Sequence, residues 1–557
     1  PFVWSLLFSF KSSEQLYGGN PLDLWPRPFT MENYERLFQV LPFDKFTVNS
    51  VFLSVAMPLC MIAVASLTAY ALTRLEFRGR NILFLAFIAT MMIPSHVTLI
   101  PNYKIVVDMK LINTYAALFL TNMFTGANAF NIFFFRQFYG FNQNDELYYL
   151  SMTRRFVQGD GMRVDEWNNG QLFTFLLLPF MKAALWLLGG TEGIVLLTRV
   201  CFLIFQGIVA VVSFLLLRKQ GWSAAVCGIS FFAFTPFNIS VFSYNTLAIS
   251  FLFLIFSACA SGRSWGRKGY MGVGILLAFS ILANPYIFFL YLFYGILCMS
   301  NTIARKQKEG HLCFRSFFWV SVGAGIVFVA FVCFVFSSGS LREMIQNLGY
   351  IVNDAERQRP FLEKVLKYPE RLWRYYGCLL CTAAVCIILR ILDRERRFPE
   401  MLYTGSMGVI VMLCLVRYGL FWDHVAINFI QVPVSFFGLL VYCMEPEKKS
   451  GFFRYWYLPA LLFTFLAHMA ADTGILAVSS AFWLVSASSI YLLWNAVRNR
   501  GILHRMVFWS VCGLQILLTS FLRIDYVWGD NPLPELTVQL TEGSMKGIYT
   551  TEENRAL

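Results

Sequence analysis

Long apolar runs separated by short polar segments dominate the chain. Runs of about 20 apolar residues are long enough to cross the hydrocarbon core of a bilayer as α-helices. Three of them precede residue 136, at about 48–72, 82–100 and 115–135. Twelve more follow residue 190, at about 194–217, 224–237, 247–260, 271–282, 287–299, 317–336, 372–391, 401–416, 425–444, 456–470, 475–494 and 506–522. The pattern predicts an all-α polytopic membrane protein with about 15 spans.

The segment Gln171–Leu188 is apolar but short, and it contains Pro179 and Lys182. A helix lying at the membrane interface suits this composition better than a full span.

The apolar pattern breaks abruptly between residues 130 and 169. The chain is almost uninterrupted hydrocarbon up to Phe138 and then becomes polar and acidic. The sequence therefore predicts two unlike membrane pieces, residues 1–138 and residues 139–523. The second piece opens with an outer loop, 139–192, and is followed by a polar extracytoplasmic tail, 524–557. The chain starts without an initiator Met, and both ends are expected to be truncated.

Basic clusters recur at every second loop after residue 190, beginning with Arg218-Lys219. The positive-inside rule makes these loops cytoplasmic, which places Asp145 outside. The basic segment Arg74–Arg80 is cytoplasmic by the same rule, and alternation then brings Arg136 to the inside. Because Arg136 and Asp145 are only nine residues apart, the two orientations conflict. A non-functional chimeric reading frame is therefore one interpretation of this sequence.

Composition supports a multi-pass membrane protein, because 57% of the residues are apolar and only 14% are charged. The net charge of +13 is attributed to cytoplasmic loops and not to nucleic-acid binding, since no basic tail or aromatic platform accompanies it. The thirteen cysteines are scattered through apolar runs and are interpreted as small hydrophobes. Cys378 and Cys381 have CxxC spacing, but their apolar context favours packing over metal binding.

Several short motifs occur in order within residues 1–138. They include Ser9-Phe10-Lys11-Ser12, Thr30-Met31-Glu32-Asn33-Tyr34, Asn49-Ser50, Leu67–Arg74, Phe77–Arg80, Met92-Ile93-Pro94, Leu99-Ile100-Pro101, Leu111–Tyr115 and Phe135-Arg136-Gln137-Phe138. This part resembles the permease subunit of binding-protein-dependent carbohydrate ABC importers, of the maltose type. The resemblance implies an inner-membrane location and sugar uptake. It also implies three partners: an ABC ATPase, a sister permease and an external sugar-binding protein.

The sequence departs from this family after Phe138. In the family, the Phe-Arg-Gln-Phe motif leads into a cytoplasmic loop of the Glu-Ala-Ala type that docks into the ATPase. Here Tyr139-Gly140-Phe141-Asn142 follows, and no such loop is recognisable downstream. Residues 1–138 are therefore expected to be a permease fragment that does not transport by itself. No P-loop signature is present, so an ATPase would be a separate chain.

Residues 139–557 resemble membrane glycosyltransferases that use polyprenyl-phosphate sugars, of the protein-mannosyl and aminoarabinosyl transferase kind. The resemblance rests on Asp145-Glu146, Tyr148-Tyr149, Gly159-Asp160, Trp167–Gln171 and Thr198-Arg199. It implies a catalytic role for Asp145, as the base at the acceptor hydroxyl or as the ligand of a divalent metal, with Glu146 beside it. The alternative is that these acids are solvated loop residues. No cofactor is certain, and a divalent metal is the one considered.

Other polar residues near the outer ends of spans are candidates for substrate binding. Arg199 lies one turn into a span, where its guanidinium could grip a donor phosphate or snorkel to the headgroups. The remaining candidates are the loop acids and the polar residues at two short outer loops, each of which is also common in wet loops or aromatic belts: Asp160, Asp165, Tyr244, Asn245, Asn284 and Tyr286.

Overall fold

The structure is a computed structural model, and helices account for nearly all of its regular elements, which confirms the all-α prediction. It describes residues 2–18, 25–40, 42–74, 95–123, 139–140, 146–162, 165, 169–236, 239–261, 265–303, 311–339, 341–346, 361–392, 431–444, 451–470, 475–499, 502–525 and 535–552. The chain forms two compact units: residues 1–68 with 95–131, and residues 69–94 with 132–557.

In its described residues, the first unit has one long helix and five shorter ones. The long helix α4 (Phe43–Arg74) belongs to this unit up to Thr68, and it includes the predicted span 48–72. The other helices are α1 (Phe2–Ser9), α2 (Ser13–Gly18), α3 (Glu32–Val40), α6 (Ser95–Asp108) and α7 (Tyr115–Met123).

Helix α6 differs from the predicted pattern. The predicted apolar run ended near residue 100 and the next began near residue 115, but α6 continues to Asp108 with Pro101 inside it. The turn comes later, where Lys110 and Asn113 adopt positive φ angles of 57° and 62°. Asn tolerates this left-handed backbone better than most residues, which explains why the chain reverses there.

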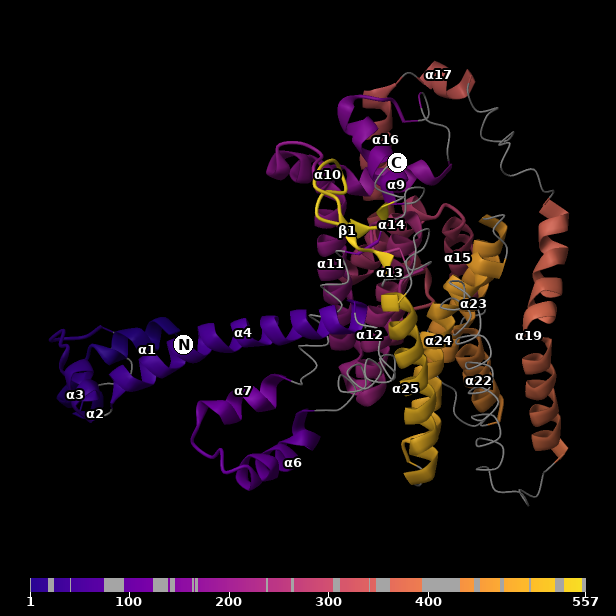
Figure 1. Cartoon of the computed structure of the whole chain (residues 1–557). Coiled ribbons are helices and arrows are strands. Elements are labelled where there is room, and N and C mark those ends of the chain that lie inside the picture. The colour runs from indigo at the N-terminus through magenta and orange to yellow at the C-terminus, as the bar shows by residue number, and fades with distance from the viewer. Residues whose placement is uncertain are drawn as a thin grey trace. The chain divides into compact units, whose positions relative to one another are not determined.

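The second unit contains most of the predicted helices. Helix α11 spans Ile194–Leu217, the same residues as the predicted run. The others are α9 (Glu146–Gln158), η1 (Asn169–Phe173), α10 (Thr174–Leu188), η2 (Arg218–Gln220), α12 (Trp222–Ala233), α13 (Tyr244–Ala260), α14 (Arg267–Ala283), α15 (Ile287–Ile303), α16 (Phe314–Ser338), α17 (Leu341–Gln346), α19 (Phe361–Leu392), α22 (Gln431–Met444), η4 (Phe453–Tyr457), α23 (Leu458–Ala470), α24 (Ile475–Val497) and α25 (Ile502–Asp525). Figure 1 labels most of them.

Four helices in the described ranges are long and apolar enough to cross a membrane, or five if the bent helix α19 counts as one span. They are Gln171–Leu188, Ile194–Gln220, Phe314–Ser337 and Ser480–Val497. The first of these is the segment predicted to lie at the interface. Shorter apolar helices, among them Tyr244–Ala260 and Ile287–Ile303, accompany them. The chain is a multi-pass membrane protein, and the figure of about 15 spans stays a prediction.

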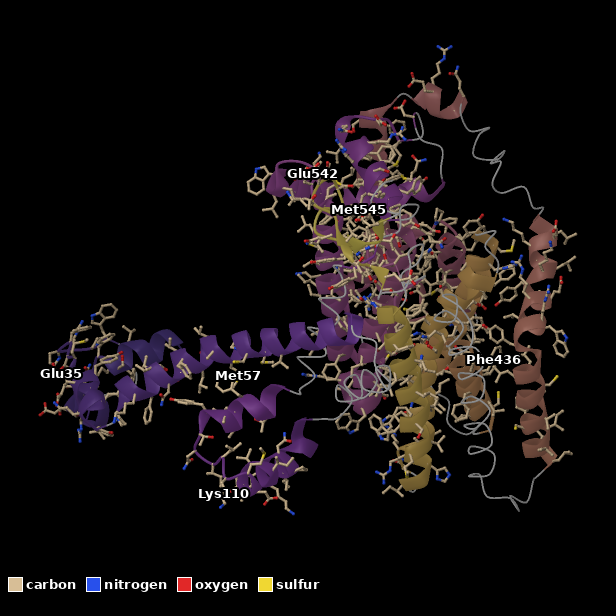
Figure 2. The ribbon with its side chains drawn as sticks, in the orientation of Figure 1. Glu35, Met57, Lys110, Phe436, Glu542 and Met545 are labelled. Atoms are coloured by element: carbon tan, nitrogen blue, oxygen red, sulfur yellow. The ribbon has the colours of Figure 1, made fainter. Side chains whose placement is uncertain are left out.

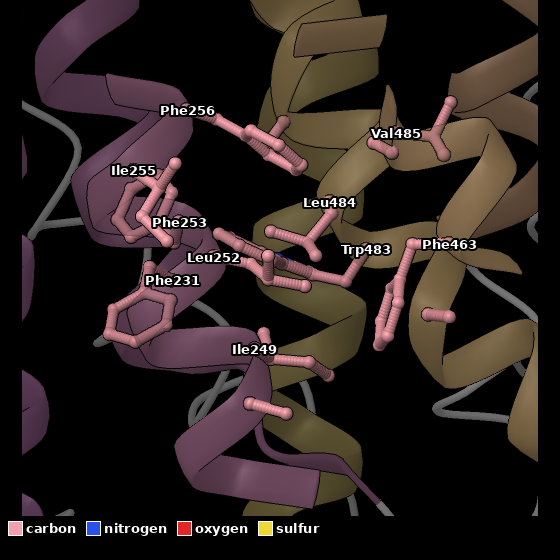
Figure 3. Packing of buried hydrophobic residues seen from close by; sticks show 14 of the residues in the cluster. Phe231, Ile249, Leu252, Phe253, Ile255, Phe256, Phe463, Trp483, Leu484 and Val485 are labelled. Carbon is pink, nitrogen blue, oxygen red and sulfur yellow. The ribbon is translucent and has the colours of Figure 1, made fainter. Parts of the chain in front are cut away.

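A large aromatic and aliphatic core holds the second unit together. Trp483 on α24 is fully buried, and its ring lies 5.1 Å from Phe253 on α13 and 5.2 Å from Phe231 on α12. Figure 3 shows these side chains converging from helices far apart in the sequence. Because such rings each bury 150–250 Å², the core supplies a large share of the packing energy.

Glycines allow two helices of this unit to touch. A Cβ at Gly274 on α14 would lie 2.0 Å from the carbonyl oxygen of Val320 on α16. A Cβ at Gly323 on α16 would lie 2.1 Å from the carbonyl oxygen of Met271. Small residues at such positions let the backbones approach closely, as is common between membrane helices.

The predicted polar tail contains a small hairpin that the sequence analysis did not predict. Strand β1 (Val538–Gln539) pairs antiparallel with β2 (Tyr549–Thr550). Tyr549 also forms a parallel bridge with Tyr139. Residues 535–552 are therefore folded onto the second unit, as the yellow segment of Figure 1 shows.

Candidate functional site

In the first unit, two of the motifs that carry the permease resemblance contact each other. The Asn33 amide donates to the carbonyl oxygens of Ser9 and Lys11 at 3.0 and 2.7 Å. The hydroxyls of Ser9 and Tyr34 lie 2.7 Å apart. The motif residues therefore tie the end of α1 to the start of α3.

A second pair of these motifs meets between α4 and α7. The Tyr115 hydroxyl donates to the Asn49 side-chain oxygen at 2.5 Å. The Tyr115 ring packs 5.2 Å from Phe52, one turn away on α4. The hydrogen bond between Tyr115 and Asn49 thus joins α7 to α4 across 66 positions of the chain.

In the second unit, the structure joins two residues that the sequence analysis selected separately. Arg199 on α11 makes a bidentate contact with Glu146, the first residue of α9, through its Nε and Nη2 atoms. The Nη2–Oε2 distance is 2.5 Å and the Nε–Oε1 distance is 3.2 Å. Both side chains are 4% exposed. A bidentate geometry of this kind is required for a buried ion pair to offset its desolvation cost.

The same guanidinium also donates to the backbone. Its Nη2 lies 2.6 Å from the carbonyl oxygen of Gly140, and its Nη1 lies 3.4 Å from that of Tyr139. Arg199 therefore has protein partners that neither predicted role included. Binding of a donor phosphate stays a prediction, and it would require Glu146 to release the guanidinium.

An aromatic cluster adjoins this pair. Tyr149 lies one turn after Glu146 on α9, and its ring is 5.5 Å from Phe173 and 5.8 Å from Tyr244, both edge-on. Ser243 caps helix α13 through a capping box with Thr246, and this cap places Tyr244 at the first position of the helix. Tyr244, predicted to bind substrate, thus lies beside the residues around Glu146.

The loop acids Asp160 and Asp165 do not join the pair. Asp160 accepts a hydrogen bond from Arg155 at 2.6 Å, and the Asp165 carboxylate accepts one from the Gly161 N–H at 2.7 Å. Both follow the end of α9, whereas Glu146 begins it. The two ends of α9, which has 13 residues, lie about 18 Å apart. These acids brace their own loop.

Three further candidates show no direct contact with the pair. Asn245 is half-buried on α13. Asn284 is 6% exposed, and its side-chain oxygen accepts the N–H of Tyr286 at 3.2 Å. This contact closes the turn between α14 and α15. Their substrate-binding roles stay predictions.

The proposed metal ligand cannot be placed. Asp145 lies outside the described residues, and so does Arg136, so the conflict of sidedness also stays a prediction. Within the described ranges, no three His, Cys, Asp or Glu side chains form a group that could hold a metal ion.

A set of buried polar side chains inside the bundle was not among the predicted site residues. On α25, Gln515, Thr519 and Arg523 are spaced four residues apart and are at most 3% exposed. Gln431 on α22 donates to the Thr519 hydroxyl at 3.2 Å. Arg523 donates to Gln206 on α11 at 3.1 Å. A Gln or Arg within a 20-residue apolar run was the available signal, since polar groups in a membrane need partners.

Helix α12 shows one purpose of this polar set. Its last carbonyls would be unsatisfied inside the bundle, but the Gln206 amide donates to those of Phe231 and Phe234 at 2.9 and 2.7 Å. Arg523 donates to the carbonyl of Phe232. The side chains thus cap a helix that ends within the protein.

Comparison with known proteins finds similarity to sugar-transport permeases. The chain is 31% identical over 186 residues to the arabinooligosaccharides transport system permease protein AraQ of Bacillus subtilis, covering 33% of this chain and 61% of the relative. It is 26% identical over 196 residues to AraQ of Halalkalibacterium halodurans, covering 35% and 65%. It is 31% identical over 190 residues to the sn-glycerol-3-phosphate permease protein UgpE of Brucella suis, covering 33% and 61%.

No protein-family model and no solved structure matches the chain. The chain spans about 61–65% of the length of these relatives. The aligned lengths exceed the 138 residues predicted for the permease-like part, and the boundary near residue 139 stays a prediction. The comparisons give no support for the glycosyltransferase resemblance. About a third of this multi-pass membrane chain is similar to permease subunits of sugar ABC transporters.

Proposed function

We propose that the permease-like part of the chain serves carbohydrate import across the bacterial plasma membrane. The observation that carries this proposal is the 31% identity over 186 residues to a permease of arabinooligosaccharide transport. The contacts of Asn33 and of Asn49 support it, because they give the motif residues a packing role in the first unit. An ABC ATPase, a sister permease and an external sugar-binding protein are the proposed partners.

Affinity purification from membranes tests this proposal. The full chain, tagged and expressed in its source, is expected to bring down an ATPase subunit if it is a transporter component, even though no docking loop of the Glu-Ala-Ala type follows Phe138. A matched variant, Asn33→Ala, should weaken sugar uptake and leave the amount of chain in the membrane unchanged. Uptake that does not depend on this chain, together with purification free of any ATPase, would contradict the proposal.

We infer a second candidate function for residues 139–557, the transfer of a sugar from a polyprenyl-phosphate donor. The observation that favours it is that Glu146 and Arg199, selected separately as a catalytic acid and a phosphate-binding group, lie in one place, and a donor phosphate would bind there by displacing Glu146 from the guanidinium. Tyr244 borders the same region through Tyr149. Asp145 would act on the acceptor hydroxyl, alone or with a divalent metal.

A transfer assay in membranes tests this second candidate. Asp145→Ala should abolish transfer from a radiolabelled polyprenyl-phosphate sugar, whereas Asp160→Ala should retain it, because Asp160 braces a loop away from the pair. Equal activity of Asp145→Ala and the parent chain would remove the candidate.

A chimeric reading frame is the remaining alternative. Amplification of source DNA across the codons for residues 130–149 should yield one contiguous product if the two pieces belong to one gene. Failure to obtain that product would end both functional proposals for the joined chain.

A further inference from the structure

The C-terminal hairpin, residues 535–552, makes specific contacts with three segments of the second unit. Leu536 and Ile548 are completely buried, and Met545 is 6% exposed. Met545 and Ile548 pack with Leu150 of α9 and Val195 of α11 in one apolar cluster. In Figure 2, Met545 and Glu542 mark the hairpin. Apolar burial of this extent shows that the hairpin is part of the folded unit.

The hairpin also caps helix α11. The first N–H groups of a helix have no partner within it, and Gly193 at the start of α11 offers no side-chain cap. The carbonyl oxygens of Gly543 and Ser544 accept the N–H groups of Gly193 and Val195 at 3.0 and 3.1 Å. The hairpin thus satisfies backbone donors about 350 residues earlier in the chain.

A third set of contacts leads from the hairpin to the ion pair. The Gly140 N–H donates to the carbonyl oxygen of Tyr549 at 2.7 Å, and the rings of Tyr139 and Tyr549 stack at 5.0 Å. The carbonyls of Tyr139 and Gly140 in turn accept hydrogen bonds from Arg199. Tyr139 and Gly140 therefore contact the hairpin through the Gly140 N–H and the Tyr139 ring, and they contact the Arg199 guanidinium through their carbonyl oxygens.

We propose that residues 535–552 are a positioning strap that assembles the Glu146–Arg199 pair. The strap orders Tyr139-Gly140, whose carbonyls fix the guanidinium of Arg199, and it caps the end of α11 that carries Arg199. Tyr549 and Ile548 are its key residues: Tyr549 acts through backbone and ring contacts, and Ile548 anchors the turn in the apolar cluster. The proposal does not depend on transport or on glycosyl transfer.

Disulfide trapping tests the geometry of the strap. Bridge partners on neighbouring strands are about 4.8 Å apart, within the range of Cα separations that a disulfide spans. The variant Tyr139→Cys/Tyr549→Cys in the full chain should form the bond quantitatively on mild oxidation, as located by peptide mass spectrometry. The control pair Tyr139→Cys/Glu542→Cys, which moves one partner to the turn, should not. Absence of the first bond would overturn the proposal.

Hydrogen exchange tests the positioning role. Ile548→Asp, which buries a carboxylate, should raise exchange at least tenfold at the amides of Gly140, Gly193 and Val195, whereas exposed Glu542→Ala should not. Peptides of α24 report global folding and should stay unchanged. The hairpin amides could lose protection while those of Gly140, Gly193 and Val195 keep it. In that case the strap packs against the unit without ordering these residues, and the proposal is wrong. If α24 also loses protection, the disulfide result decides.

Discussion

The two units of the chain differ in how their side chains are covered. In the second unit, apolar residues such as Trp483 and Phe253 are fully buried within the chain itself. In the described part of the first unit, Lys11 and Pro26 are the buried residues, and several apolar side chains in the N-terminal half of α4 are exposed. Val48, Val51 and Val55, for example, are 67%, 59% and 57% exposed.

This difference indicates where each unit obtains its stability. The second unit carries its own core, so its packing is decided within one chain. The apolar face of α4 can be covered by lipid or by another protein, and the proposed sister permease would provide the latter. Substitutions in the second unit should therefore reduce overall stability, whereas those in the first unit should act locally.

The largest effect is expected at the buried ion pair. Arg199→Leu leaves the Glu146 carboxylate buried without its guanidinium, which should cost about 3–5 kcal/mol. Thermal unfolding in detergent measures the loss. Arg154→Leu, an exposed position on α9, is the matched control. The double variant Arg199→Leu/Glu146→Leu should be more stable than Arg199→Leu alone, and a loss equal to or larger than the sum of both single losses would contradict this account.

A smaller effect is expected where α14 crosses α16. Gly274→Val would place its Cβ 2.0 Å from the backbone of Val320, so the helices must separate. Overpacking of this kind costs about 1–3 kcal/mol. Gly272→Val on the same helix should cost much less, since nothing lies within 4 Å of its Cβ position. Equal melting temperatures of the two variants would show that the close approach is not needed.

A local effect is expected in the first unit. Asn33→Ala removes two hydrogen bonds, to the carbonyls of Ser9 and Lys11, which should cost about 1–2 kcal/mol. Hydrogen exchange should rise in peptides from residues 9–34 and stay unchanged in α24. A matching rise in α24 would mean that the two units unfold together.

The smallest effect is a pH dependence at His311, in the connection between α15 and α16. Burial lowers the pKa of His311 below its ordinary value of 6.5, because a buried imidazolium is poorly solvated. Its Nδ1 lies 3.2 Å from the Tyr270 hydroxyl, and the ring of Tyr455 packs 5.7 Å away.

The unfolded chain therefore binds this proton more readily than the folded one. The contribution of the neutral, buried His311 to the free energy of unfolding is therefore complete above pH 6.5. It falls as the pH drops below 6.5, because protons then bind the unfolded chain preferentially. Melting temperatures at pH 7.5 and 5.5 should differ less for His311→Gln than for the parent chain. An identical difference in both would assign the pH dependence to other groups.

Some residues of the candidate site were recognisable from the sequence, but their arrangement was not. Glu146 stood out through the glycosyltransferase resemblance, and Arg199 because a charge one turn into a span is costly. Their pairing joins positions 53 residues apart, which no local pattern encodes. The hairpin escaped prediction because its strands are two residues long, too short for an alternating pattern.

The sequence by itself determined the all-α membrane fold and helices such as Ile194–Leu217, because a bilayer requires long apolar runs that satisfy their own backbone hydrogen bonds. The tertiary structure alone decided which polar groups meet: Arg199 with Glu146, Arg523 with Gln206, and Tyr549 with Tyr139. The reason is physical. Hydrophobicity is a property of each residue, whereas a buried charge or strand edge is satisfied only by a partner that folding brings from elsewhere in the chain.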